Sequence, residues 1–330
     1  MININSELQI KNSVFKNRVI VPPMASQTAD ELGYVTNETL NHYHRLATSD
    51  ASLVLVEYSY VSLDGKSEPK QLGIDSYEKV MGLRQLSNMI KQTRVLAGIQ
   101  LVHAGAKSTS ELTGGKLIAP SPISTPVKGQ ELEIPLQATL ADIEKLKKDF
   151  IRAAKIAVHA NFDVIEIHAA HGYGINQWLS PITNQRTDQY GGTLYNRARI
   201  LFEIVSEIRA LFPKLIISVR IPGQDHFENG TTTTDSILIS KKLVYLGVDI
   251  INVSSGIGGW RRPRDRRGEG YLVEDARRIQ KHINAPVIGV GGIKTKKYIE
   301  ENLQNKSFSF AAIGRAILEN PIMGKQLLTR

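Results

Sequence analysis

The sequence predicts an α/β fold, a single (β/α)8 barrel of the TIM type. From Val19 onward, eight short apolar or β-branched runs alternate with helical patterns within 330 residues, and regular alternation indicates a closed parallel sheet with helices outside it. No change in composition marks a linker, so we expect one domain over residues 1–330. An open, doubly wound sheet is the alternative, disfavoured because no G-x-G-x-x-G follows the first strand.

Local patterns place each element. Two short β segments around Lys11-Asn12-Ser13 predict a hairpin before the barrel. The eight predicted strands are Val19–Val21, Leu53–Val56, Leu96–Leu101, Val164–Ile167, Ile216–Val219, Ile250–Val253, Val287–Val290 and Phe308–Ile313. The predicted helices are Asn37–Thr48, Tyr77–Thr93, Leu140–Ala160, Asn196–Leu211, Thr234–Leu246, Leu272–His282 and Lys294–Asn302.

Two predicted loops are long, namely Ala104–Thr139 after the third strand and Gly172–Tyr195 after the fourth. Loops beyond about 15 residues are usually functional. Both follow the carboxyl ends of strands, so we expect them to cover the same mouth of the barrel.

Composition limits the chemistry. The chain has no cysteine, which excludes disulfides, thiol nucleophiles, iron–sulfur clusters and cysteine-bound zinc, so redox chemistry requires a bound organic cofactor. The net charge of +9 gives a mild preference for anionic partners without predicting nucleic-acid binding. No apolar run reaches the roughly 20 residues of a membrane span and the first residues are polar, so we expect a cytoplasmic protein with no membrane partner.

The fourth strand ends in a cluster of polar side chains, His168, His171 and Tyr173. Two imidazole N–H groups on one substrate oxygen stabilise negative charge that develops there. Metal binding with Glu166 is a weaker interpretation because no helical H-x-x-x-H spacing is present, and two histidines that merely cap a loop are another. We expect hydrogen-bond donors to a substrate and no metal.

Other strand ends carry groups suited to a cofactor. Gly291, Gly292, Gly314 and Arg315 follow the last two strands, where barrel enzymes often bind phosphate, although tight turns alone also use glycine. Gln100 and Arg220 end the third and fifth strands and suit a ring rich in carbonyls and nitrogens, such as a flavin, although such an arginine is often only an ion-pair partner.

A basic run, Arg261–Arg267, follows the sixth strand at Trp260. One interpretation is a solvated basic loop. The other is a site for an anionic substrate or for the phosphates of a nicotinamide nucleotide.

The ordered motifs resemble the Old Yellow Enzyme family of FMN-dependent NAD(P)H oxidoreductases across nearly the whole chain. Their most specific part reads His168-x-x-His171-Gly172-Tyr173, Leu179-Ser180-Pro181, Asn184-x-Arg186-x-Asp188-x-Tyr190-Gly191-Gly192 and Asn196-Arg197. Further support comes from Pro23-Met24, from Gly98-Ile99-Gln100-Leu101 with His103-Ala104-Gly105, and from Ile313-Gly314-Arg315-Ala316.

The resemblance implies FMN across the barrel mouth and NADH or NADPH as reductant. It implies that Pro23, Met24 and Ala25 border the flavin, that Gln100 and Arg220 contact its ring, and that Gly291, Gly292, Gly314 and Arg315 hold its phosphate. His168 and His171 would bind a carbonyl oxygen, and Tyr173 would donate a proton to the α-carbon. The implied reaction is ping-pong hydride transfer to the β-carbon of an enone-type substrate.

The sequence departs from the family pattern at four positions. Ala25 stands where many bacterial members have cysteine, and Gln27 where a tyrosine often helps to bind substrate. Tyr58 stands beside the expected flavin where a small residue is frequent, and Ala106 replaces an arginine. An FMN-binding or metabolite-sensing barrel with little ene-reductase turnover is therefore the alternative function, and a homo-oligomer is possible.

Overall fold

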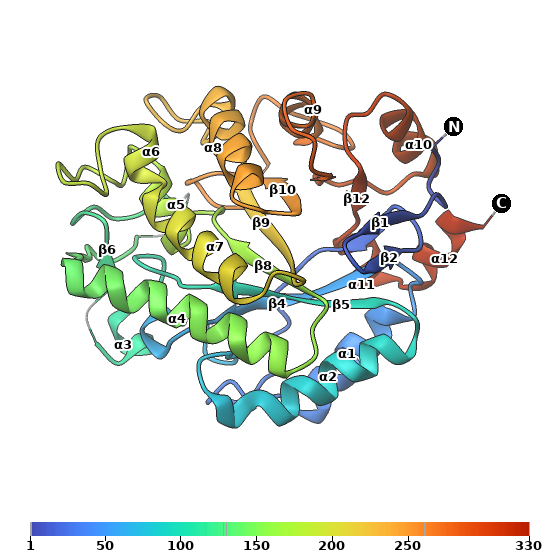
Figure 1. Cartoon of the computed structure of the whole chain (residues 1–330), viewed down its shortest axis with the longest axis horizontal. Helices are drawn as coiled ribbons and strands as arrows, with labels where there is room; N and C mark the ends of the chain where they lie inside the picture. Colours follow the sequence, from blue (N-terminus) through green and yellow to red (C-terminus); the bar gives the residue numbers. More distant parts are fainter. Residues whose placement is uncertain (1, 116, 128, 130, 261, 330) are drawn as a thin grey trace.

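Eight parallel strands close into a barrel in this computed structural model, which describes residues 2–115, 117–127, 129, 131–260 and 262–329. Figure 1 shows the helices outside the strands. In order around the barrel, the strands are β3 (Val19–Val21), β4 (Leu53–Tyr60), β5 (Leu96–Val102), β8 (Val164–His168), β9 (Ile216–Pro222), β10 (Ile250–Ser254), β11 (Val287–Gly289) and β12 (Phe310–Ala312). The predicted TIM barrel is confirmed.

The outer helices follow the strands as predicted. They are α1 (Asn37–Ala47), α2 (Val80–Gln92), α4 (Leu140–His159), α7 (Arg199–Leu211), α8 (Thr233–Tyr245), α9 (Val273–Gln280) and α10 (Lys296–Gln304), with α11 (Arg315–Glu319) and α12 (Ile322–Leu328) after β12. Three of them, α1, α4 and α8, begin at a threonine whose side chain accepts from the third helical N–H while that residue's side chain binds back, which defines the helix start. None of the described helices is long and apolar enough to cross a membrane.

Two predicted helices are divided. Tyr77–Thr93 becomes a 3-10 turn at Tyr77–Lys79 followed by α2, and Asn196–Leu211 becomes α6 (Leu194–Arg197) and α7. The long loops contain short elements of their own: α3 (Ser110–Thr113), β6 (Ile118–Ala119) and β7 (Leu136–Gln137) in the first, and α5 (Gly174–Leu179) in the second. Apolar periodicity does not detect elements this short.

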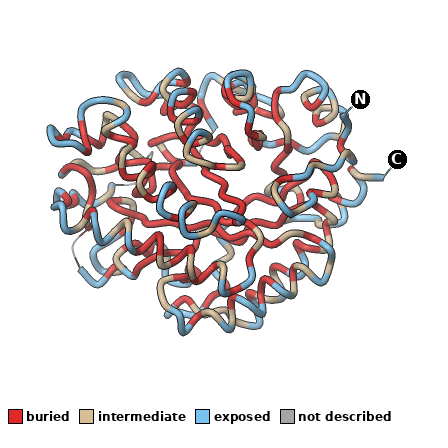
Figure 2. The backbone as a smooth tube through the Cα atoms, in the orientation of Figure 1, coloured by how far each residue is buried: buried red, intermediate tan, exposed pale blue. Residues whose placement is uncertain are grey.

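The predicted N-terminal hairpin is formed by β1 (Leu8–Ile10) and β2 (Ser13–Phe15). Phe15 is fully buried, with its ring centroid 5.0 Å from that of Phe310. It joins an apolar cluster with the first residues of several barrel strands, among them Leu53, Val164 and Ile216. The hairpin therefore packs against the N-terminal end of the barrel, and Figure 2 shows the buried residues following the strands.

Several strands are longer than predicted, and in β4 and β9 the difference is large enough to change where side chains lie. β4 continues to Tyr60 through an irregularity between Val56 and Tyr58, and β9 continues to Pro222. The sequence predicted that Gln100 and Arg220 end their strands. That was wrong: Gln100 lies inside β5 and is fully buried, and Arg220 lies inside β9 and is 7% exposed.

We expect Phe15→Ala to lower the free energy of unfolding by roughly 3–5 kcal/mol, because it leaves a cavity between the hairpin and Phe310. Val14→Ala on the same hairpin is the control, since Val14 is 47% exposed and surface changes usually stay within about 0.5 kcal/mol. Urea unfolding followed by circular dichroism measures both. Equal losses would contradict the packing role of Phe15.

Candidate active site

Inside the barrel, polar side chains replace apolar ones toward the carboxyl ends of the strands. Glu166 is fully buried and accepts hydrogen bonds from Gln100 Nε2 at 2.8 Å, Ser218 Oγ at 2.8 Å and Asn252 Nδ2 at 2.9 Å. Because Gln100 donates its amide nitrogen downward to Glu166, its Oε1 atom remains buried without a partner. Asn252 Oδ1 is likewise unpartnered, so two buried oxygen atoms here can accept further hydrogen bonds.

Arg220 lies two residues above Ser218 on β9. Its Nη2 atom donates to Ser254 Oγ at 3.2 Å, while its Nε atom is buried without a partner. Burial lowers the pKa of the guanidinium, and the charge of Glu166 opposes this shift. Arg220 therefore contributes a buried positive charge whose Nε donor is unpartnered.

His168 ends β8 and His171 follows it, with ring centroids 5.1 Å apart. Burial, followed by the positive charge of Arg220, lowers the pKa of both imidazoles well below the usual value. Both rings are therefore neutral at pH 7.

Hydrogen-bond partners assign the tautomers. His168 Nδ1 accepts from the Ala170 N–H at 3.3 Å, which leaves the His168 proton on Nε2. Ser254 Oγ accepts from Arg220 and shares a hydrogen bond with His171 Nε2 at 2.7 Å. When the Ser254 hydroxyl is the donor in this pair, the His171 proton lies on Nδ1, and each ring retains one N–H donor.

The backbone at His171 is strained. Its φ of 61° lies in the left-handed region, as does the φ of 75° at Gly172. Left-handed non-glycine residues are uncommon and gather at functional sites. The His171 N–H donates to the Ser255 carbonyl at 3.1 Å, which helps to hold this conformation.

Gln27, another predicted site residue, has a φ of 52° and is exposed.

Tyr173 completes the predicted cluster. Its ring centroid lies 4.9 Å from that of His168, and burial raises the pKa of its phenol to about 12. Lys107 Nζ lies 4.0 Å from the Tyr173 ring centroid and donates to the His171 carbonyl at 2.8 Å. Burial lowers the pKa of Lys107 to about 8. The structure thus brings His168, His171 and Tyr173 together.

Tyr58 reaches the same cluster because β4 is irregular. The registers Val56 to Ile99 and Tyr58 to Gln100 leave Glu57 as an extra residue, a β-bulge. Tyr58 then packs with its ring centroid 5.3 Å from that of Tyr173 and 6.4 Å from that of His168.

Glu57, at the bulge, supports the β3–α1 loop. The Ser26 hydroxyl donates to its carboxyl group, as does the Tyr43 hydroxyl at 3.3 Å. Burial raises the pKa of Glu57 to about 7. This pairing fixes the loop that contains Pro23, Met24 and Ala25, of which Met24 is half-buried and Ala25 is exposed.

The glycines of the predicted phosphate site lie at the rim. Gly291 and Gly292 have φ values of 122° and 74°, and a Cβ atom on Gly291 would come within 2.9 Å of the Leu272 nitrogen. Only glycine fits such a turn. A Cβ atom on Gly314 would lie 3.2 Å from Met24 Sδ. Gly314 therefore lies beside the β3–α1 loop, and Arg315 after it is exposed.

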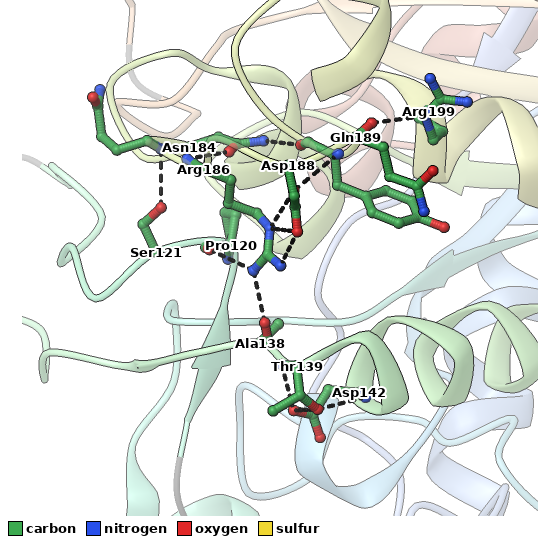
Figure 3. A network of polar contacts seen from close by, with 12 residues as sticks. Pro120, Ser121, Ala138, Thr139, Asp142, Asn184, Arg186, Asp188, Gln189 and Arg199 are labelled. Atoms are coloured by element: carbon green, nitrogen blue, oxygen red, sulfur yellow. Dashed lines mark hydrogen bonds and ion pairs between the residues drawn. The ribbon is translucent and has the colours of Figure 1, made fainter.

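The segment after Tyr173 joins the two long loops (Figure 3). Arg186 Nη1 donates to the carbonyls of Ala138 at 2.6 Å and Pro120 at 3.1 Å, while its Nε binds Asp188 at 3.0 Å. The Gln185 N–H donates to Ser121 Oγ at 2.9 Å. These contacts hold the loop after β5 onto the loop after β8 at one side of the mouth.

Some arginines of the basic run make contacts within the protein. Arg266 pairs with the buried Asp275 at 2.6 Å, and Arg262 lies 4.8 Å from the Tyr271 ring centroid. Arg261 lies outside the described residues. Arg266 is thus an ion-pair partner, and an anion-binding use of the run remains a prediction.

Residues 6–328 match the NADH:flavin oxidoreductase / NADH oxidase family. An NADPH dehydrogenase of Geobacillus sp. (strain WCH70) is 37% identical over 317 residues, which are 96% of this chain and 91% of the relative. The chain belongs to this family. It is an enzyme, an FMN-dependent NADH or NADPH oxidoreductase of the Old Yellow Enzyme type that the motifs predicted.

Solved structures share the fold. An Old Yellow Enzyme homologue from Zymomonas mobilis superposes with a TM-score of 0.86 at 23% identity, covering 99% of this chain and 92% of that one. A 2-naphthoyl-CoA reductase superposes with a TM-score of 0.93 at 23% identity over 99% of this chain. The present chain spans 52% of that reductase.

The barrel mouth fits the FMN of this family. An isoalloxazine ring offers both N–H donors and carbonyl acceptors, and the buried unpartnered Gln100 Oε1 and Arg220 Nε atoms are one acceptor and one donor. At the rim, Gly291 and Gly292 form a positive-φ turn without Cβ atoms, the kind of backbone that barrel enzymes use to bind phosphate.

Sequence reasoning weighed Glu166 only as a metal ligand and missed Ser218, Asn252 and Ser254. The missed signal is the alternation of strand side chains, since residues 166 and 168, 218 and 220, and 252 and 254 must face the same side. Within the described ranges, no group of three His, Asp or Glu side chains is arranged to hold a metal ion. Glu166 instead accepts hydrogen bonds from three side chains on three other strands.

We expect Arg186→Lys to loosen the joined loops, because an ammonium cannot reproduce the planar set of donors that reaches two carbonyls and Asp188. The free energy of unfolding falls by about 1–3 kcal/mol, and limited proteolysis within residues 104–139 accelerates. Arg199→Lys is the control, because Arg199 donates to the exposed Gln189 carbonyl outside this junction. Unchanged cleavage in Arg186→Lys would refute the clamp.

Proposed function

We propose that this enzyme reduces the C=C bond of α,β-unsaturated carbonyl compounds, as a single FMN-binding domain over residues 1–330. The observation that carries the proposal is the convergence of two neutral imidazole donors and one buried phenol, His168, His171 and Tyr173, at the end of β8. The similarity to an NADPH dehydrogenase supports NADPH as reductant, with NADH as the alternative.

The residues that would hold FMN surround this cluster. FMN bound there would supply the hydride-transfer chemistry between the nicotinamide and the substrate β-carbon. Gln100 and Arg220 would contact its ring, and Pro23, Met24, Ala25 and Tyr58 would border it. Gly291, Gly292, Gly314 and Arg315 would hold its phosphate. Their support is the buried unpartnered atoms of Gln100 and Arg220 and the positive-φ turn at Gly291 and Gly292.

The histidines bind and orient the substrate in this proposal. His168 Nε2–H and His171 Nδ1–H donate to its carbonyl oxygen, where negative charge develops as hydride adds to the conjugated carbon. Neutral donors suit this task because their protons stay in place while the oxygen gains charge. The strained His171 backbone and the Ser254 hydrogen bond hold one donor in a fixed orientation.

Tyr173 donates the proton to the α-carbon. Burial raises its pKa to about 12, so the phenol is fully protonated at pH 7 and is a weak acid. A weak acid suffices because the enolate carbon is a strong base, and Tyr173 is largely buried, with 7% exposure. Gln27, exposed at the rim, would contact the outer part of the substrate.

A second candidate function is an FMN-binding or metabolite-sensing barrel with little ene-reductase turnover. The observation that favours it is Tyr58, whose ring packs against Tyr173 and His168 and occupies space where a small residue is frequent in the family. Such a protein binds FMN but is not reoxidised faster by an enone than by oxygen.

Anaerobic spectroscopy decides between the two. Purified protein with FMN should bleach on addition of NADPH or NADH, and its absorbance should recover when 2-cyclohexenone is added. Each nucleotide is tried separately, with a saturated ketone as the control. Bleaching without enone-dependent recovery supports the second candidate, and a protein that takes up no FMN contradicts both.

Two substitutions test the roles of Tyr173 and His171 in the separate half-reactions, which are reduction by NADPH and oxidation by the enone. Tyr173→Phe should slow oxidation of the reduced protein by enone about 10²–10⁴-fold, the usual contribution of a positioned acid, while leaving reduction by NADPH unchanged. His171→Ala should weaken binding of a phenol, which resembles the enolate, by about 10-fold or more through loss of one donor, without releasing FMN. Equal slowing of both half-reactions in Tyr173→Phe would refute the proton-donor role.

A further inference from the structure

The side chain of Lys107 contacts two members of the candidate site. Its Nζ atom donates to the His171 carbonyl at 2.8 Å and lies 4.0 Å from the centroid of the Tyr173 ring. The first contact is a hydrogen bond from an ammonium group, and the second is a cation–π contact, in which the positive charge faces the ring. One side chain therefore links the proposed oxygen-binding residue to the proposed proton donor.

The loop that carries Lys107 is fixed to α5. Gln177 of α5 is buried, and its Nε2 atom donates to the carbonyls of Ala104 at 2.9 Å and Gly172 at 2.8 Å. Its Oε1 atom accepts from the Ala106 N–H at 3.0 Å. Lys107 thus extends from a segment whose backbone is held next to the turn at Gly172.

The backbone of His171 depends on contacts from other loops. Its φ of 61° lies in the left-handed region, which costs free energy for a residue with a Cβ atom. The His171 N–H donates to the Ser255 carbonyl at 3.1 Å, and the His171 carbonyl accepts from Lys107. Loss of Lys107 would remove one of these two contacts and let the imidazole turn away from its donor position.

A stabilising role alone does not account for Lys107. Burial lowers its pKa to about 8 although Glu68 attracts the charge, so the ammonium group is unfavourable in this place. The same positive charge contributes to the lowered pKa of His168 and His171. A buried charge that acts on site residues is typical of functional sites.

We propose that Lys107 is a positioning residue of the reaction, which holds His171 and Tyr173 in one fixed arrangement through its ammonium group. The proposal rests on the proposed function, in which these two residues bind the substrate oxygen and donate the proton. Lys107 itself transfers no proton and forms no bond with the substrate. It orients the His171 donor and places a positive charge over the ring that becomes a phenolate when the Tyr173 proton leaves.

Phenol binding tests this arrangement before any turnover. 4-Methoxyphenol resembles the enolate, and its affinity for the oxidised, FMN-loaded protein is measured from the change in flavin absorbance. Lys107→Met, which has a similar length and no N–H donor, should weaken this binding about 10-fold, while reduction by NADPH stays within about 2-fold of wild type. Unchanged phenol affinity would refute the proposal.

A double-mutant cycle shows whether Lys107 acts through His171. In the His171→Ala background, Lys107→Met should weaken phenol binding by about 2-fold or less, because the side chain that Lys107 orients is gone. A loss of about 10-fold in both backgrounds would mean that Lys107 acts on the ligand independently of His171, which overturns the proposal.

Lys66→Met is the matched control. Lys66 is also buried, donates to the Glu31 carbonyl at 2.5 Å and lies 5.6 Å from the Tyr60 ring centroid. It therefore makes the same two kinds of contact outside the site, and its replacement should leave phenol binding unchanged. Equal losses of phenol affinity in Lys66→Met and Lys107→Met would show a general effect of removing a lysine and refute the positioning role.

A second measurement needs neither FMN nor a ligand. With 3,5-difluorotyrosine at position 173, fluorine NMR follows the titration of this phenol. Lys107→Met should raise the midpoint by about one pH unit or more, because the phenolate loses a neighbouring positive charge. Lys107→Gln keeps an N–H donor and loses the charge, so it should raise the midpoint equally, and it replaces Lys107→Met if that variant does not fold. An unchanged midpoint would overturn the role of the ammonium group at Tyr173.

Turnover separates positioning from proton supply. Positioning affects every oxidation of the reduced protein by 2-cyclohexenone alike, so Lys107→Met should slow the first and all later ones by the same factor. We expect about 10-fold, below the 10²–10⁴-fold range of a directly acting acid. A first oxidation at the wild-type rate followed by slow later ones would mean that Lys107 supplies protons to Tyr173, and would contradict the proposal.

These outcomes distinguish two failures. If the reduced wild-type protein is not reoxidised by enones, the proposed function fails and the positioning role fails with it. If wild type is reoxidised and Lys107→Met is indistinguishable from Lys66→Met, only the positioning role fails.

Discussion

The buried carboxylate of Glu166 organises the interior of this barrel. A charge without water is tolerated only when donors surround it, and Gln100, Ser218 and Asn252 supply three hydrogen bonds from three different strands. Meeting this demand orients the Gln100 amide and supports the positive charge of Arg220 above it. The groups that face the mouth are therefore fixed from below, before any ligand binds.

The side chains nearer the barrel mouth are held by their neighbours in the same way. Arg220 donates to Ser254, which fixes His171, and the charge of Arg220 helps to keep both imidazoles neutral. In this site, each polar or charged side chain sets the protonation or the orientation of the side chain above it. Removing a lower member would disturb groups that it never touches.

The sequence contained enough to predict the barrel, because strand and helix periods alternate over the whole chain, and enough to collect His168, His171 and Tyr173, because they are neighbours on one strand end. It did not reveal the bulge at Glu57, since a single extra residue leaves no periodic trace. It also misplaced Arg220, because a charged residue usually marks the end of a buried strand and here has buried partners. The role of Arg186 depended on carbonyls more than 40 residues away, which no local pattern encodes.

The bulge also bears on how this site changes during evolution. Side chains alternate along a strand, so one added residue reverses which positions face inward from that point onward. The apolar layer formed by Leu53 and its neighbours lies before the bulge and is unaffected. A length change at Glu57, rather than a substitution, would thus exchange the aromatic lining of the mouth while preserving the barrel beneath it. Insertions and deletions at this one position offer a route to new specificity that leaves the foundation of the fold intact.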